Sequence, residues 1–200
     1  MLYVLDAFNR EEEQKTHIIW ETAKSFEGTP EICDKLLCYM RIGAKKYKIP
    51  EGVTTLCFES FVDEEGDWFD CDAVSLELPA SLTKIEDNAF LFTEFKSVRL
   101  APGNKSFIVK KGGLYTADGK RLIYILAKDG NQEFQVEEGT ELIDAGVFDR
   151  GGTIHIPASV KRFGTVRICD GQGLKLLASK GSCAERFAQK MGFDFEPIDV

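Results

Sequence analysis

The sequence lacks a long apolar segment and a cluster of basic residues. Its longest continuous apolar run extends from Leu122 to Ala127, far short of the roughly 18 residues that a membrane-spanning helix needs. No basic leader followed by an apolar stretch begins at Met1, so we expect neither a membrane span nor a signal peptide. The net charge of −8 repels nucleic-acid phosphates. We therefore do not expect a nucleic-acid partner.

The location of the protein depends on its native start. If translation begins at Met1 we expect a cytoplasmic protein, and if an export leader has been removed we expect a secreted or cell-surface one.

Catalytic and metal-binding motifs are also missing. The chain has two histidines, His17 and His155, and contains no G-x-S-x-G, HExxH or phosphate-cradling loop. Its six cysteines are spaced by 5, 19, 14, 98 and 14 positions and form no CxxC pair. We expect reduced thiols, no metal, no cofactor and no enzymatic activity. Cys183 alone has chemical interest, because the start of a helix favours a thiolate.

What the sequence does contain is an internal repeat. Six triplets read apolar, polar, apolar, the pattern of a short strand with one buried face. They are Tyr47-Lys48-Ile49, Leu76-Glu77-Leu78, Val98-Arg99-Leu100, Phe134-Gln135-Val136, Ile154-His155-Ile156 and Leu174-Lys175-Leu176.

A shared downstream pattern supports the repeat. In four copies a large apolar residue follows seven positions after the triplet and another follows five positions later, as in Leu78, Ile85 and Phe90. The shortest spacing between middle residues is 20. A period of this length predicts a solenoid of stacked coils, an architecture that presents binding surfaces.

The flanks and the main insertion carry their own signals. Residues 10–26 show helical spacing after a capping pair, so we predict an amphipathic helix there. Residues 29–42 are ambiguous: local signals favour a helix, but Lys35-Leu36-Leu37-Cys38-Tyr39 also fits a strand. Asp118-Gly119 predicts a hairpin turn. Ser182 and Glu185 form a capping box, and Gly192 is placed to end the helix that follows.

These segments resemble the BspA-type leucine-rich repeat family. Leu76 to Phe90 matches the family pattern I-x-I-P-x-S-V-x-x-I-x-x-x-A-F almost throughout, and Phe134 to Phe148 matches with Glu137 where proline is usual. Gly113 to Tyr124 is similar to the family's G-x-L-Y…DGK-x-L-I hairpin. Gly181 to Ala188 is similar to its closing G-S-x-A-E-x-Y-A helix.

The resemblance and the patterns together predict the domain plan. We expect a leucine-rich repeat solenoid of short stacked β-strands, with a β-hairpin insertion and a helical cap at each end. The predicted parts are an N-terminal helical capping segment at 1–46, repeats at 47–178 with the hairpin insertion at 104–130, and a C-terminal capping helix and tail at 179–200. The resemblance implies adhesion or another binding role and no shared catalytic residues.

The candidate binding residues follow from this plan. The middle triplet residues are expected to line one solvent-facing sheet surface, and two aromatic residues could contact a protein or glycan partner from a loop. These residues are Lys48, Glu77, Arg99, Gln135, His155, Lys175, Trp68 and Phe69. The alternatives are a structural spacer or capping domain, or an enzyme that uses Cys183 or the acidic loop 63–72.

Overall fold

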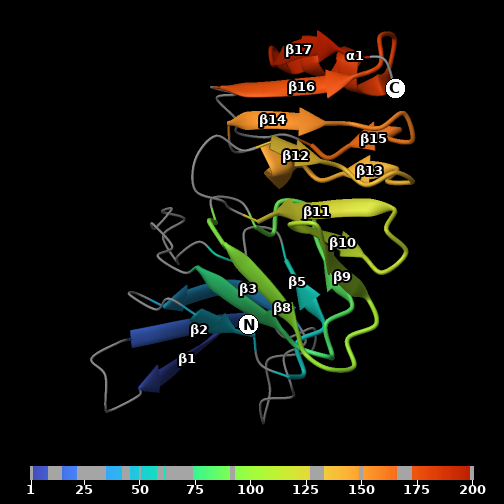
Figure 1. Ribbon diagram of the computed structural model, residues 1–200. Coiled ribbons are helices and arrows are strands. Elements are labelled where there is room, and N and C mark those ends of the chain that lie inside the picture. Colours follow the sequence, from blue (N-terminus) through green and yellow to red (C-terminus); the bar gives the residue numbers. More distant parts are fainter. Residues whose placement is uncertain are drawn as a thin grey trace. The chain divides into compact units, whose positions relative to one another are not determined.

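The computed structural model describes two compact units, Met1–Ser106 and Phe107–Val200 (Figure 1). The described residues are 2–8, 15–21, 35–41, 46–49, 51–57, 61, 74–90, 93–126, 133–148, 151–165 and 173–198. Within these described residues, each unit contains two β-sheets. Strands therefore dominate both units, as short alternating apolar and polar triplets predict.

The N-terminal segment forms strands where helices were predicted. β1 (Leu2–Phe8), β2 (Lys15–Glu21) and β3 (Lys35–Arg41) form an antiparallel meander. The predicted helix over 10–26 is therefore wrong at β2, and the helix favoured over 29–42 is wrong at β3. The alternative strand interpretation of residues 35–39 is confirmed. The capping pair Asn9 and Glu12 lies outside the described residues.

Pairing along the chain explains this outcome. In β2, the sequence His17-Ile18-Ile19-Trp20 is rich in β-branched and aromatic residues, which fit an extended pleated strand. All seven residues of β2 have partners in β1, and its other edge pairs with β3. Backbone pairing on both edges outweighs the weak helical periodicity of this segment.

The rest of the first unit consists of short parallel strands. β4 (Lys46–Lys48), β6 (Ser75–Leu78) and β8 (Ser97–Leu100) form one sheet, in the register Tyr47, Leu76, Val98. β5 (Thr55–Leu56) and β7 (Lys84–Ile85) pair in parallel and extend from β3. Successive chain segments therefore lie next to one another in both sheets.

The apolar anchors of the repeat form the interior of this unit. Leu56, Ile85, Phe61 and Phe90 are all buried. The rings of Phe61 and Phe90 stack with centroids 5.5 Å apart, and Phe95 meets the Phe61 ring edge-on at 5.3 Å. The residues at matching repeat positions thus contact each other, as a stacked arrangement requires.

In the second unit, β9 (Phe107–Lys110), β10 (Gly113–Thr116) and β11 (Arg121–Ile125) form an antiparallel meander. The predicted hairpin turn at Asp118-Gly119 is confirmed. Gly119 has φ +70°, and its N–H donates to the carbonyl of Thr116 at 2.8 Å. β11 then pairs in parallel with β13 (Leu142–Ile143), and β13 with β15 (Arg162–Phe163).

The other sheet of the second unit contains four parallel strands in consecutive order (Figure 1). They are β12 (Glu133–Gln135), β14 (Gly152–His155), β16 (Leu174–Ala178) and β17 (Asp194–Pro197). A short 3-10 helix, η1 (Ala145–Phe148), follows β13. Ile143, Val136, Ile156 and Leu176 belong to one buried cluster.

The predicted C-terminal helix is present as α1 (Cys183–Met191). The Ser182 hydroxyl accepts from the backbone N–H of Glu185 at 3.2 Å. The Glu185 carboxylate accepts from Gly181 N–H, and Gly192 ends the helix in the left-handed region. Ala184 and Ala188 are buried in the cluster. Local capping signals were sufficient here because the helix ends are satisfied by nearby residues.

The boundary between the two units lies at Ser106/Phe107, just after the start of the predicted hairpin insertion. The predicted divisions at residues 46 and 178 stay predictions.

Candidate functional site

The sheet of the first unit aligns three of the predicted binding residues. Lys48, Glu77 and Arg99 occupy one row across β4, β6 and β8. Their neighbours Tyr47, Leu76 and Val98 are buried, so alternation places the row on the outer face. Adjacent members lie about 4.8 Å apart along the hydrogen-bonding direction. The predicted row therefore exists across these three strands.

Lys48 and Glu77 form an ion pair within this row. Lys48 Nζ lies 2.8 Å from Glu77 Oε1. The hydrogen bond to Glu77 raises the pKa of Lys48, and the nearby charges of Glu77 and Glu51 add to the effect. The Glu51 carboxylate accepts from the backbone N–H of Ala80 at 2.9 Å, and this bond lowers the pKa of Glu51. The Glu51 carboxylate therefore stays ionised near Lys48 at neutral pH.

The second unit aligns Gln135 and His155 but not Lys175. Gln135 pairs with His155, and His155 pairs with Leu177. Lys175 lies opposite Thr153 and is therefore two positions away from its predicted row. A shift of two keeps Lys175 on the outer face, because side chains alternate with a period of two. The six residues thus divide between two sheets in two separate units.

Polar side-chain contacts also cross the outer face of the second sheet. His155 Nε2 lies 2.6 Å from Glu133 Oε1, and Lys175 Nζ lies 3.2 Å from Glu196 Oε2. β17 adds Asp194 and Glu196 to this face, and both are exposed. Sequence patterns missed β17 as a strand, although the alternation of Phe193, Asp194 and Phe195 was the signal for it.

The two outer faces have opposite charge. The β4–β6–β8 face carries the cations Lys46, Lys48 and Arg99 and one carboxylate, Glu77. The β12–β14–β16–β17 face carries one lysine, Lys175, and three carboxylates: Glu133, Asp194 and Glu196. The separation of charge between the two faces could not be predicted from the sequence. The repeat pattern gives all six triplets the same role and does not show which of them share a sheet.

The remaining candidates fall in different places. Trp68, Phe69 and the whole acidic loop 63–72 lie outside the described residues. Cys183 is half-buried, and its thiol donates to the carbonyl of Lys161 at 3.1 Å. Within the described ranges, no group of three or more His, Cys, Asp or Glu side chains could hold a metal ion. In the same part of the chain, no helix is long and apolar enough to cross a bilayer.

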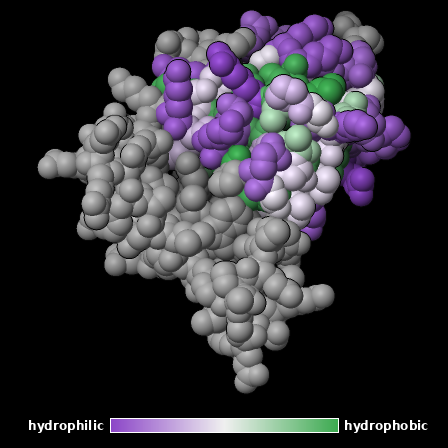
Figure 2. Space-filling model, turned by 90° about the horizontal axis from the view of Figure 1, so that it is seen from below, coloured by the Kyte–Doolittle hydropathy of each residue, from purple (hydrophilic) through white to green (hydrophobic). Residues whose placement is uncertain are grey.

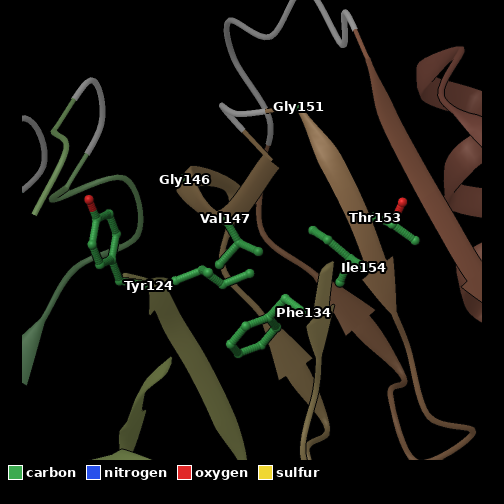
Figure 3. Close-up of a pocket in the computed structure, with 8 residues that line it drawn as sticks. Tyr124, Phe134, Gly146, Val147, Gly151, Thr153 and Ile154 are labelled. Carbon is green, nitrogen blue, oxygen red and sulfur yellow. The ribbon is translucent and has the colours of Figure 1, made fainter. Parts of the chain in front are cut away.

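A small pocket in the second unit is lined by both apolar and polar groups. Phe134, Val147 and Ile154 point toward one another in it, from β12, η1 and β14 (Figure 3). Its cavity volume of about 20 Å³ is close to that of a single water molecule. This pocket therefore has no room for an organic ligand. On the face that Figure 2 shows, the described residues present hydrophilic side chains with smaller apolar areas between them.

A solved structure with a similar fold is a leucine-rich repeat protein. A leucine-rich repeat protein from Eubacterium ventriosum matches with a TM-score of 0.50 and 16% identity, over 66% of this chain and 41% of that protein. The parallel strand ladders described above have the topology that such a fold requires. The chain has a leucine-rich repeat fold. It spans less than half the length of that protein.

Two further structures match more distantly. A leucine-rich cell surface protein from Faecalibacterium prausnitzii has a TM-score of 0.44 and 22% identity, covering 66% of this chain and 40% of that protein. The pneumococcal vaccine antigen PcpA has a TM-score of 0.42 and 12% identity, covering 78% and 68% respectively. No protein-family profile matches the chain, and no curated protein matches it significantly.

Proposed function

We propose that this chain is a non-enzymatic interaction module of the BspA-type leucine-rich repeat kind. Its coils stack as a solenoid, and its outer sheet faces and loops bind a protein or glycan partner. The observation that carries this proposal is the alignment of polar side chains on the outer face above buried apolar neighbours, as in the row Lys48, Glu77, Arg99.

The BspA-type assignment is supported by segments with matching structural roles. The triplet Leu76-Glu77-Leu78 lies in β6, the Gly113 to Tyr124 motif forms the β10–β11 hairpin, and the closing motif forms α1. Each motif of the family pattern thus coincides with a separate element.

A partner-capture experiment with face variants tests the proposal. The immobilised protein would be incubated with host and bacterial lysates, alongside charge reversals at Lys48 and Arg99 on one face and at Lys175 on the other. Lys190→Glu on α1 serves as the matched control, because it makes the same charge change at an exposed position that is not on a sheet strand. We expect loss of specific partners with at least one face variant and not with the control. Identical capture by all variants would contradict binding through the sheet faces.

The non-enzymatic part of the proposal is tested separately at Cys183. Its thiol is already engaged with the Lys161 carbonyl, a contact that positions the first turn of α1. We expect alkylation of Cys183 by iodoacetamide to be no faster than that of a free thiol. A markedly faster reaction would reveal an activated nucleophile and would count against this proposal.

A further inference from the structure

The outer face of the β4–β6–β8 sheet is rich in hydrogen-bond donors. Lys46 and Lys48 lie two positions apart on β4, and Arg99 lies in the Lys48 row on β8. Lys46, Lys48 and Arg99 are all exposed. Ser75 and Ser97 occupy the Lys46 row on the neighbouring strands. Their hydroxyl groups can also donate hydrogen bonds.

The only carboxylate in these two rows is already paired. Glu77 accepts from Lys48 at 2.8 Å, which leaves the charges of Lys46 and Arg99 uncompensated among the described residues. The face is therefore cationic on a chain whose net charge is −8. A local charge opposite to the net charge directs an anionic partner to this face rather than to the rest of the surface.

Strand geometry fixes the spacing of the donors. Lys46 and Lys48 lie about 6.6 Å apart along β4, because a strand rises about 3.3 Å per residue. An extended peptide with acidic residues at alternate positions presents its carboxylates on one side with the same repeat. The charge and the spacing of this face thus match such a segment.

We propose that the β4–β6–β8 face binds an extended acidic segment of a partner protein, with Lys46, Lys48 and Arg99 contacting its carboxylates. This inference rests on the proposed function and specifies its partner chemistry. Lys175 has no part in it, because Lys175 lies on the oppositely charged sheet of the second unit.

Peptide binding measures the inference directly. A fluorescent peptide of about 12 residues that alternates Glu and Ser would be titrated with the full chain and followed by anisotropy. A peptide of equal composition with its Glu residues in one block tests the spacing, and a Gln-Ser peptide tests the charge. Salt of about 20 mM and about 500 mM would be compared, because screening weakens exposed ion pairs. We expect the alternating peptide to bind most tightly, and only at low salt.

Matched variants then locate the binding. Lys46→Glu and Arg99→Glu are expected to weaken binding at least about threefold each, as exposed ion pairs of up to about 1 kcal/mol allow. Lys180→Glu and Lys190→Glu change the net charge equally but lie outside both sheets, and they are expected to leave the affinity unchanged.

Glu77→Gln is expected to increase the affinity for the peptide, a result that misfolding of the variant could not produce. It removes the carboxylate of these rows and frees Lys48, so we expect binding about two- to fivefold tighter. The inference is overturned if the chain does not bind the alternating peptide, if Lys190→Glu weakens binding as much as Arg99→Glu, or if Glu77→Gln has no effect. Tighter binding of a heparin oligosaccharide than of the peptide would also overturn it. If the peptide experiment fails but the face variants still change the capture of lysate partners, the broader proposed function is retained.

Discussion

Glu137 shows how one residue can depart from a repeat pattern and gain contacts. It occupies the position where the related pattern has proline, and its carboxylate pairs with Lys110 and Lys111 at the end of β9. Its backbone N–H donates to the hydroxyl of Tyr115 at 3.4 Å, a bond that proline could not make. Burial raises the pKa of Tyr115 to about 12, so this hydroxyl stays protonated at neutral pH. Glu137 therefore joins the meander to the residues after β12.

Replacing Glu137 with Gln is expected to reduce the free energy of unfolding at neutral pH. It is also expected to make that free energy less dependent on pH. The hydrogen bonds from Lys110 and then Lys111 lower the pKa of Glu137 below its usual 4.5. The unfolded chain then binds more protons than the folded one, so this contribution is complete above pH 4.5 and disappears as pH falls through the folded value. Urea midpoints measured between about pH 7 and pH 3 should show a smaller loss on acidification in the variant. Glu138→Gln, an exposed neighbour, is the control.

Arg121 and Asp144 form a partly buried pair whose separation is expected to be costly. Two guanidinium nitrogens of Arg121 contact the two Asp144 oxygens at 2.7 and 2.6 Å, and the Asp144 side chain is only 4% exposed. Arg121→Met should destabilise the protein by roughly 2–4 kcal/mol, because it leaves a buried carboxylate without this partner. A double-mutant cycle with Asp144→Leu should recover part of the loss in urea unfolding. Strict additivity of the two single changes would contradict this coupling.

At the scale of elements, the β9–β11 meander depends on two glycines for different reasons. A Cβ on Gly113 would lie 2.6 Å from the Tyr115 ring and 3.0 Å from that of Phe134, whereas one on Gly119 would meet nothing within 4 Å. Gly113→Ala should therefore cost about 1–3 kcal/mol through overpacking. Gly119→Ala should cost about 1 kcal/mol through its left-handed backbone alone. Chemical denaturation of both variants makes the comparison, and an equal or smaller loss at Gly113 would refute it.

Helix α1 offers a prediction about capping. Ser182→Ala removes the acceptor for Glu185 N–H and should cost about 1 kcal/mol, while Ser182→Asp should retain most of the stability. Amide exchange in the first turn of α1 reports the local effect, because its protection depends on this cap. Equal protection in the Ala and Asp variants would show that the cap contributes nothing.

Elements defined by local chemistry could be predicted from the sequence. The Asp118-Gly119 turn and the Ser182 and Glu185 caps act within a few residues, so their patterns identified the hairpin and α1. β2 could not be predicted in this way, because it becomes a strand only by pairing with β1 and β3. Its helical periodicity was a weak local preference that longer-range pairing overrode.

At the scale of the whole molecule, the second unit has the means to fold alone. It has a buried cluster that includes Phe148, Leu176 and Ala188, and two sheets formed entirely from its own strands. We expect a fragment of residues 107–200 to unfold cooperatively in urea, monitored by circular dichroism. A broad transition with strong dye binding would indicate a loosely packed state and would contradict this independence.

The candidate site was predictable in its parts and not in its arrangement. Alternation in each triplet placed Lys48, Arg99 and His155 on outer faces, since burial of the flanking residues decides this locally. Which residues share a row depends on register and on the division into units. The sequence pattern repeats every 20 positions here, so Ile154 would be expected opposite Leu174. In the sheet, Phe134 pairs with Ile154, and Ile154 pairs with Leu176.

The shift at β16 implies that insertions and deletions within such strands are constrained to an even number of residues. Inserting two residues shifts a strand along its neighbour but keeps each side chain on its solvent-facing or buried face. Inserting one residue moves every side chain of the strand to the opposite face. Length changes that survive within these strands should therefore come in even numbers. Odd ones should be confined to the connecting loops, where no neighbouring coil dictates which way a side chain must point.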